Sequence, residues 1–279
     1  MHSNTLLRAA AVLIMTLPAG ALGCGSGSTS GAGSSSTGGD PSAKPYVIVH
    51  GAWQGAWAWD SVAAGLRARG ASVTVVELPA HGDDQTAISA ATFDAYTAKV
   101  ESAVDAAGGP VVLVGHSLGG MVISEVAEQR ADQIDKLVYV AAFVPKDGDS
   151  LLALAQTDAD SHLGPALVVD PTAGTAGVPL DQLDDVFCAD CSTAALQSLH
   201  ANYRVEPLAP LEATVHLTAG SFGKVAKYYV YTTQDHAVSY PFQQKMTAGV
   251  TIAATASLDT GHSPSLSDPD RVISTLLGF

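Results

Sequence analysis

Short runs of β-branched and other apolar residues recur from residue 46 onward. They lack the regular apolar–polar alternation of half-exposed strands, which favours strands buried on both faces of a parallel sheet. The sequence predicts six such strands: Tyr46–Val49, Val73–Val76, Val111–Val114, Leu137–Val140, Tyr228–Tyr231 and Thr251–Ala256.

Between these runs, apolar residues return at the spacing of one helix face. Residues 59–66 predict a helix that ends at Gly70, and residues 93–104 predict another with Thr92 as its N-cap. Asp268-Pro269 marks the start of a last helix. Strands that alternate with helices predict an α/β fold with a doubly wound, mainly parallel six-stranded sheet.

Residues 143–224 break this alternation. The segment has no good strand, several prolines and short helical patches, one of which begins at the capping residue Ser192. Because an insertion after the carboxyl end of a strand overhangs the site at that edge, we expect a helical cap here.

The N-terminal residues predict export. Arg8 precedes an apolar run at 9–17 that is too short to span a bilayer and is typical of a signal peptide, which we assign to residues 1–23. Two cleavage sites stay open. Ala19-Gly20-Ala21 suits signal peptidase and would release a soluble protein. Leu22-Gly23-Cys24 resembles a bacterial lipobox, in which Cys24 is acylated, although Ala21 stands where Leu is usual.

The remaining chain divides in two. Residues 24–44 are rich in Gly and Ser and predict a flexible tether, and residues 45–279 form the expected domain. We expect a membrane-anchored lipoprotein facing the periplasm or the cell surface, or else a periplasmic or secreted protein. Membrane contact is expected only through that lipid.

Composition narrows the class of protein. With 47% hydrophobic residues the chain has enough apolar side chains for a packed core. It carries 13 Lys and Arg against 27 Asp and Glu, a formal net charge of −14. Because such a charge repels phosphate backbones, a nucleic-acid partner is excluded.

The motif that carries most information is Gly115-His116-Ser117-Leu118-Gly119. This G-x-S-x-G sequence lies directly after a predicted buried strand and directly before a helical run, the context of a nucleophile elbow. Its glycines permit a tight turn that exposes the serine hydroxyl, and the following helix points its N-terminus at the site. We therefore predict Ser117 as a nucleophile.

A serine nucleophile needs a base and a group that orients the base. Asp235 and His262 each follow a late predicted strand, so both fall at the same sheet edge as Ser117. We predict the catalytic triad Ser117, Asp235 and His262. Among the rivals, His236 is interpreted as loop surface or pocket wall, Asp259 as too close to His262 on one loop, and Asp268 as a helix cap.

An oxyanion hole requires two backbone N–H groups. We expect them from Leu118, which follows the nucleophile, and from Ala52, on the loop after the first strand. Gly51, Trp53, His116 and Phe143 are expected to line the substrate pocket.

Other candidate chemistry is weaker. His50, His81 and His116 follow strand ends, but no H-E-x-x-H or similar ligand spacing occurs, so no metal and no organic cofactor are predicted. Cys188 and Cys191 leave two interpretations open, a short-range disulfide and a pair of free thiols.

Taken together, the motifs resemble the α/β-hydrolase superfamily, in the branch of plant methylesterases, hydroxynitrile lyases and bacterial EstC-type esterases. The resemblance covers nearly all of residues 45–279. It is carried by Val-His-Gly-Ala-Trp-Gln-Gly-Ala-Trp-Ala-Trp at 49–59, Gly-His-Ser-Leu-Gly-Gly at 115–120, Ala-Ala-Phe-Val-Pro at 141–145, Pro-Leu-Ala-Pro-Leu at 207–211, Thr-Gln-Asp at 233–235 with Gln243 or Gln244 and Met246 after it, and Gly-His-Ser-Pro at 261–264.

The resemblance implies a serine carboxylesterase of small or medium acyl or aryl esters, acting on a small-molecule substrate through an acyl-enzyme. Lyases of this branch carry Thr in place of Gly51 and Lys directly after the catalytic histidine, where this chain has Ser263. Without that cation, departing cyanide has no charge partner. The alternatives are a non-catalytic ligand-binding protein on the same scaffold and a hydroxynitrile lyase.

Overall fold

A computed structural model of the protein describes residues 44–279. The predicted signal peptide, the acylation site Cys24 and all but the last residue of the predicted tether lie outside the described residues. Within residues 44–279 no helix is both long enough and apolar enough to cross a membrane.

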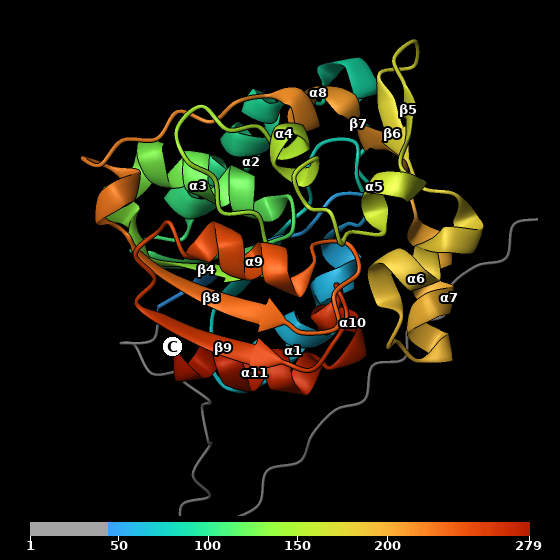
Figure 1. Ribbon diagram of the computed structural model, residues 1–279. Coiled ribbons are helices and arrows are strands. Elements are labelled where there is room, and N and C mark those ends of the chain that lie inside the picture. Colours follow the sequence, from blue (N-terminus) through green and yellow to red (C-terminus); the bar gives the residue numbers. More distant parts are fainter. Residues whose placement is uncertain (1–43) are drawn as a thin grey trace, which may run out of the picture. The chain divides into compact units, whose positions relative to one another are not determined.

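A six-stranded sheet forms the centre of the domain (Figure 1). All neighbouring strands are parallel, in the order β2-β1-β3-β4-β8-β9. Their bounds are β1 Tyr46–Val49, β2 Val73–Val76, β3 Val111–His116, β4 Ile134–Val140, β8 Ala226–Thr232 and β9 Ala254–Leu258. The predicted α/β fold is confirmed, although the last strand lies three residues beyond the predicted start.

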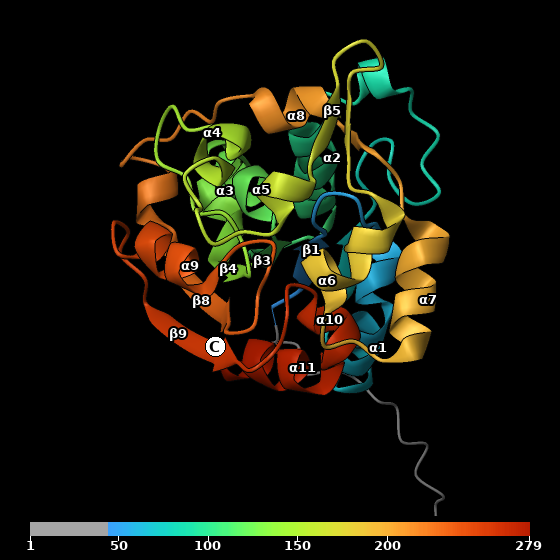
Figure 2. The same ribbon diagram turned by 45° about the vertical axis from the view of Figure 1, so that its right-hand side comes forward.

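Helices cover both faces of the sheet. Figure 2 shows α1, α10 and α11 together on one face, and α2, α3 and α9 lie on the other. Side-chain caps begin three of these helices, from Thr92, Ser239 and Asp268. Their bounds are α1 Asp60–Ala68, α2 Phe93–Ala106, α3 Gly119–Arg130, α9 Tyr240–Thr247, α10 Pro264–Ser267 and α11 Pro269–Gly278. Short 3-10 helices span Ala56–Trp59, Ile88–Ala90, Ala131–Gln133, Leu180–Gln182 and Phe222–Lys224.

Alternate residues of each strand enter two separate cores. Val47 and Val49 of β1 pack with α2 and α3, whereas Tyr46 and Ile48 pack with α1 and α11. Because both faces are buried in this way, the strands appear in the sequence as continuous apolar runs.

The cap follows β4 and lies on the side toward which β8 and β9 point (Figure 1). The prediction of a cap without strands was wrong, because a three-stranded antiparallel sheet, β5-β6-β7, accompanies its helices. These strands have two or three residues each, too few for a periodic pattern to show. The cap elements are α4 Leu151–Ala155, α5 Leu163–Ala166, β5 Val168–Asp170, β6 Thr175–Gly177, α6 Leu183–Cys188, α7 Thr193–Asn202, β7 Glu206–Pro207 and α8 Leu208–Glu212.

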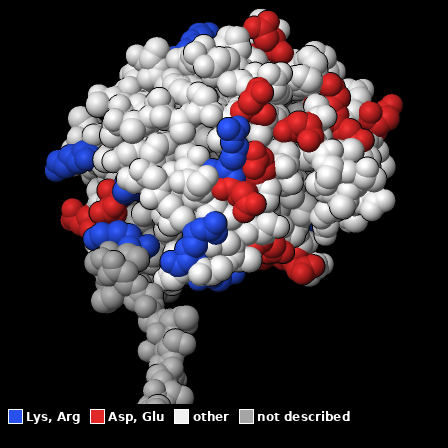
Figure 3. Space-filling model, turned by 90° about the horizontal axis from the view of Figure 1, so that it is seen from below, with Lys and Arg blue, Asp and Glu red and all other residues white. Residues whose placement is uncertain are grey.

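Charge is unevenly spread on the surface that faces downward in Figure 1. In that view Asp and Glu gather mainly on one half of the face and Lys and Arg mainly on the other (Figure 3).

Candidate active site

Ser117 lies at a sharp turn between β3 and α3. Its φ of 52° is in the left-handed region, which is uncommon for a non-glycine residue. The flanking glycines make this turn possible: a Cβ at Gly115 would lie 2.6 Å from the Gly119 carbonyl oxygen, and one at Gly119 would lie 2.6 Å from the Val49 oxygen. The elbow therefore has the backbone conformation that its sequence predicts.

The strand register brings the other two expected residues to the same edge. Thr232, the last residue of β8, pairs with Leu258, the last of β9. Asp235 follows β8 by three residues and His262 follows β9 by four, so both lie just beyond the carboxyl ends of adjacent strands.

Asp235 and His262 are in direct contact. His262 Nδ1 lies 2.9 Å from Asp235 Oδ2 and 3.1 Å from Oδ1, and both side chains are buried. Because an ionised carboxylate only accepts, Nδ1 carries the proton and Nε2 is the basic nitrogen of the neutral ring. This is the tautomer that a general base requires.

The carboxylate of Asp235 is itself fixed by four donors. Oδ1 accepts hydrogen bonds from the backbone N–H groups of Ala237 and Val238, both at 2.8 Å. Oδ2 accepts from Thr232 Oγ1 at 2.8 Å and from Gln243 Nε2 at 3.1 Å. Gln243 was noted in the sequence only as part of the family resemblance, without a role.

The rival carboxylates lie elsewhere. Asp259 Oδ1 accepts hydrogen bonds from Thr233 Oγ1 and Gln234 Nε2 on the protein surface. Asp268 accepts from the Arg271 N–H and caps α11. Neither forms a hydrogen bond with His262.

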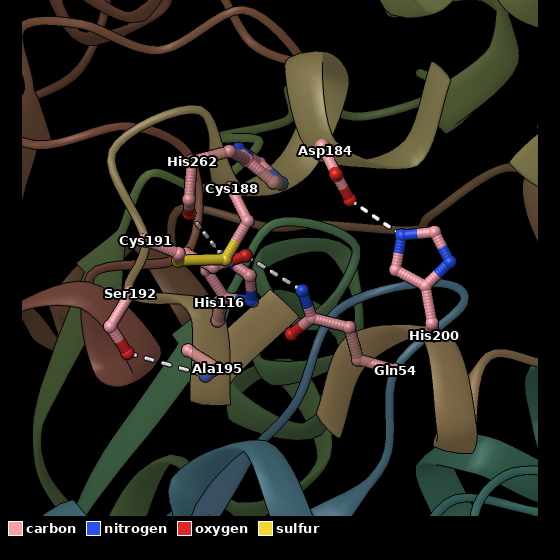
Figure 4. Close-up of a disulfide and its surroundings, with 10 residues drawn as sticks. Gln54, His116, Asp184, Cys188, Cys191, Ser192, Ala195, His200 and His262 are labelled. Carbon is pink, nitrogen blue, oxygen red and sulfur yellow. Dashed lines mark hydrogen bonds and ion pairs between the residues drawn. A yellow bond between two sulfur atoms is a disulfide. The ribbon is translucent and has the colours of Figure 1, made fainter. Parts of the chain in front are cut away.

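A hydrogen bond from His116 connects the elbow to the loop that carries His262. His116 Nε2 donates to the His262 carbonyl oxygen over 2.8 Å, and the two ring centroids lie 4.8 Å apart (Figure 4). Its Nδ1 is buried and has no hydrogen-bond partner in the described part of the chain. Burial, reinforced by the nearby His262, lowers the pKa of His116 well below its usual range. His116 is therefore a neutral residue that anchors His262.

No hydrogen bond joins Ser117 Oγ to His262 Nε2 among residues 44–279. In unliganded enzymes this bond is often long and tightens only when substrate binds. The structure thus brings two of the three expected triad residues into contact and places the third at the adjacent turn.

The loop after β1 approaches the elbow closely. A Cβ on Gly51 would lie 2.8 Å from Ser117 Cβ and 2.8 Å from His116 Nδ1. The backbone N–H groups of Ala52 and Leu118 donate to no protein acceptor within the described range. Two unused donors beside Ser117 are what an oxyanion hole needs.

Sequence reasoning missed Glu206, a fully buried carboxylate from β7 of the cap. It accepts hydrogen bonds from the Trp53 N–H at 3.0 Å, from Tyr96 Oη at 3.1 Å and from His81 Nε2 at 2.7 Å. Burial alone raises the pKa of Glu206, but the attraction of His81 and these hydrogen bonds outweigh it, so the pKa is lowered overall. Glu206 is therefore a carboxylate that holds the loop after β1 through the Trp53 N–H.

An apolar cavity of about 260 Å³ lies in the cap beside Trp53. The Trp53 ring contacts Phe187 at 5.3 Å between centroids, and Phe187 lies 6.0 Å from the His262 ring. Of the four expected pocket residues, Trp53 lines this cavity, whereas Gly51, His116 and Phe143 do not. The cavity is lined by Trp53, Leu151, Leu152, Ala155, Gln156, Ser161, Leu163, Gly164, Leu167, Val169 and Leu211.

Cys188 and Cys191 form a disulfide, which settles the alternative left open by the sequence (Figure 4). The turn that the disulfide closes packs against the loop that carries His262. The packing is close enough that a Cβ at Gly261 would lie 2.6 Å from Asp190 Oδ1. The disulfide thus fixes a cap segment that contacts the residue before His262.

Comparison with known proteins identifies the class. Residues 46–275 match the family described as the alpha/beta hydrolase family, and the chain belongs to it. Several of its relatives are named as methylesterases or other esterases. The chain is 28% identical to Methylesterase 7 of Arabidopsis thaliana over 248 residues, 84% of this chain and 95% of the relative.

The chain also resembles two further proteins, one in sequence and one in structure. A carbendazim hydrolyzing esterase of a Nocardioides species is 44% identical over 115 residues, but this alignment covers 39% of the chain and 46% of that esterase. The crystal structure of a pyrethroid hydrolase from Sphingobium faniae shares the fold, with a TM-score of 0.77 and 22% identity, covering 85% of this chain and 97% of that one.

Proposed function

We propose that the protein is a serine carboxylesterase that hydrolyses small or medium acyl or aryl esters, with Ser117 as nucleophile, His262 as base and Asp235 as the group that orients it. The observation that carries this proposal is the buried hydrogen bond from His262 Nδ1 to Asp235, beside a serine held at positive φ. The esterase names among the relatives support it.

The proposed reaction has two steps. His262 Nε2 takes the proton of Ser117 as Oγ attacks the ester carbonyl, and the Ala52 and Leu118 N–H groups stabilise the oxyanion. The imidazolium then gives its proton to the leaving alcohol. Water, deprotonated by the same nitrogen, attacks the acyl-enzyme, which releases the acid and restores Ser117.

The cavity suggests the kind of acyl group. Its volume is about 260 Å³, and none of the described residues that line it has a charged side chain. A neutral, apolar acyl or aryl group therefore fits better than a charged one. The methylesterase relatives favour a small leaving alcohol.

A lyase reaction has less support. Ser263 follows His262, and its hydroxyl accepts a hydrogen bond from Gln54 Nε2 at 2.8 Å. This position therefore supplies no ammonium group to a departing cyanide.

We also propose that the protein is exported, on the basis of residues 1–43. The Cys188–Cys191 disulfide supports this location, because disulfides persist mainly in oxidising compartments.

The test is hydrolysis of p-nitrophenyl acetate, butyrate and octanoate by the purified full chain. Ser117→Ala and Asp235→Asn should each lower kcat by about 10⁴-fold. Asp259→Asn is the matched control, because Asp259 lies on the same loop as His262 but its hydrogen bonds are with Thr233 and Gln234. This variant should keep near wild-type activity. No turnover by folded wild-type protein, or equal loss in Asp259→Asn, would contradict the proposal.

A further inference from the structure

Two histidines and one aspartate from three separate segments meet at the protein surface, where the cap borders the loop after β8. His162 immediately precedes α5, Asp185 belongs to α6, and His236 follows β8. Potential ligand atoms of the three side chains all lie within 4.8 Å of one another. His162 Nδ1 is 2.7 Å from Asp185 Oδ2, and His236 Nδ1 is 3.0 Å from Asp185 Oδ1.

The backbone already holds this arrangement. The His162 N–H donates to the His236 carbonyl oxygen at 2.8 Å, and Ser161 Oγ donates to the Ala237 oxygen at 2.7 Å. The two imidazole rings lie 4.3 Å apart between centroids. The side chains are partly exposed, so their torsion angles can rotate. Such rotation brings the three ligand atoms closer around an ion while the backbone stays in place.

We propose that His162, Asp185 and His236 bind a zinc ion, with water completing a tetrahedral shell. Two imidazole nitrogens with one carboxylate suit Zn²⁺, whereas Mg²⁺ and Ca²⁺ prefer sites built mainly of oxygen. No Lys or Arg forms an ion pair with Asp185 among the described residues, so no protein cation competes for its carboxylate.

Binding requires a defined proton movement. In the metal-free form each Nδ1 carries the hydrogen that it donates toward Asp185. Coordination through Nδ1 shifts that proton through solvent to Nε2 of the same ring. The number of protons on each ring therefore does not change.

The ion would connect the cap to the loop that carries Asp235. His236 is the neighbour of Asp235, while Asp185 is two residues from Phe187, which packs against His262. Zinc would therefore hold the cap against the active site. This consequence for activity rests on the proposed function, whereas zinc binding itself does not.

The test is calorimetric titration of ZnCl₂ into EDTA-treated full-length protein, with MgCl₂ as a comparison. We expect one zinc site that is lost or weakened by about tenfold or more in His162→Ala and in His236→Ala. Zinc should also raise the Tm of the wild type and not of these variants. His236 is next to Asp235, so His236→Ala could disturb folding near the proposed active site. His162 lies in the cap, and His162→Ala therefore provides a second, independent test.

His200→Ala is the matched control. His200 Nε2 contacts Asp184 Oδ1 at 2.6 Å in the same cap (Figure 4), but within residues 44–279 this pair has no third ligand. His200→Ala and Ser117→Ala should bind zinc as the wild type does, whether or not the protein hydrolyses esters. Equal zinc affinity in wild type and His162→Ala, or equal weakening in His200→Ala, would overturn the proposal.

Discussion

Glu206 accepts a hydrogen bond of 3.0 Å from the backbone N–H of Trp53, across 153 residues of sequence. Trp53 has a φ of 60° and directly follows Ala52, whose N–H is the proposed oxyanion donor. A cap residue thus holds the loop after β1 in a strained conformation. The cap therefore contributes to positioning the proposed oxyanion donor as well as to covering the proposed site.

Replacing Glu206 by Gln should lower kcat about tenfold with a smaller change in KM, because the loop loses its fixed conformation. One amide oxygen cannot accept from Trp53, Tyr96 and His81 together. Breaking the buried pair with His81 should also cost about 3 kcal/mol of unfolding free energy. Steady-state kinetics well below the Tm and urea unfolding would measure the two effects.

The control is Glu212→Gln, which changes an exposed carboxylate of the same cap. Its kcat and stability should match the wild type. A proportional change of kcat in both variants would refute a positioning role for Glu206.

His116 should make stability depend on pH. Burial, with His262 nearby, lowers its pKa in the folded protein, so below about pH 6.5 the unfolded chain takes up a proton that the folded one does not. Unfolding free energy should therefore fall with decreasing pH, by up to about 1.4 kcal/mol per pH unit from this group.

The comparison variant is His116→Gln, whose amide can still donate to the His262 carbonyl. Urea unfolding at pH 7.5, 6.5 and 5.5 should show a shallower fall than in the wild type. Using the difference between the proteins removes the opposite contribution of His81, whose pKa is raised because Glu206 outweighs the effect of burial. Parallel curves would show that His116 does not titrate as argued.

The elbow could be predicted from the sequence because its determinants are local. Gly115, Ser117 and Gly119 fix one turn, and the strands and helices around it follow from periodic patterns of a few residues. The placement of Asp235 and His262 followed from chain order on a parallel sheet, a general rule of this fold.

Glu206 and the His162 cluster could not be predicted in this way. Their partners are distant in the chain, and only packing of the cap brings them together. In the sequence, Glu206 is a lone acidic residue between Val205 and Pro207, typical of an exposed position. The Cys188–Cys191 pairing likewise depends on the backbone conformation of the turn after α6. No pattern of apolar residues specifies that conformation.

Leu163 should control the length of acyl chain that the enzyme accepts. It is buried and lines the apolar cavity beside Trp53. Leu163→Ala should enlarge the cavity and raise the ratio of kcat/KM for octanoate over acetate by about tenfold, at a cost of about 3 kcal/mol in stability. Leu180→Ala, at an exposed cap position outside the cavity, should leave the ratio unchanged. An unchanged ratio in Leu163→Ala would mean that the acyl group binds elsewhere.

Gly51 should tolerate no side chain. The Cβ of Gly51→Ala would lie 2.8 Å from Ser117 Cβ, so the loop after β1 and the elbow must move apart by several tenths of an ångström. Because the Ala52 N–H would move with the loop, kcat/KM should fall about a hundredfold. Gly109→Ala adds a Cβ with no atom within 4 Å and serves as control for adding a methyl group. If Gly51→Ala keeps wild-type kcat/KM with all three p-nitrophenyl esters, the loop after β1 does not supply the oxyanion donor.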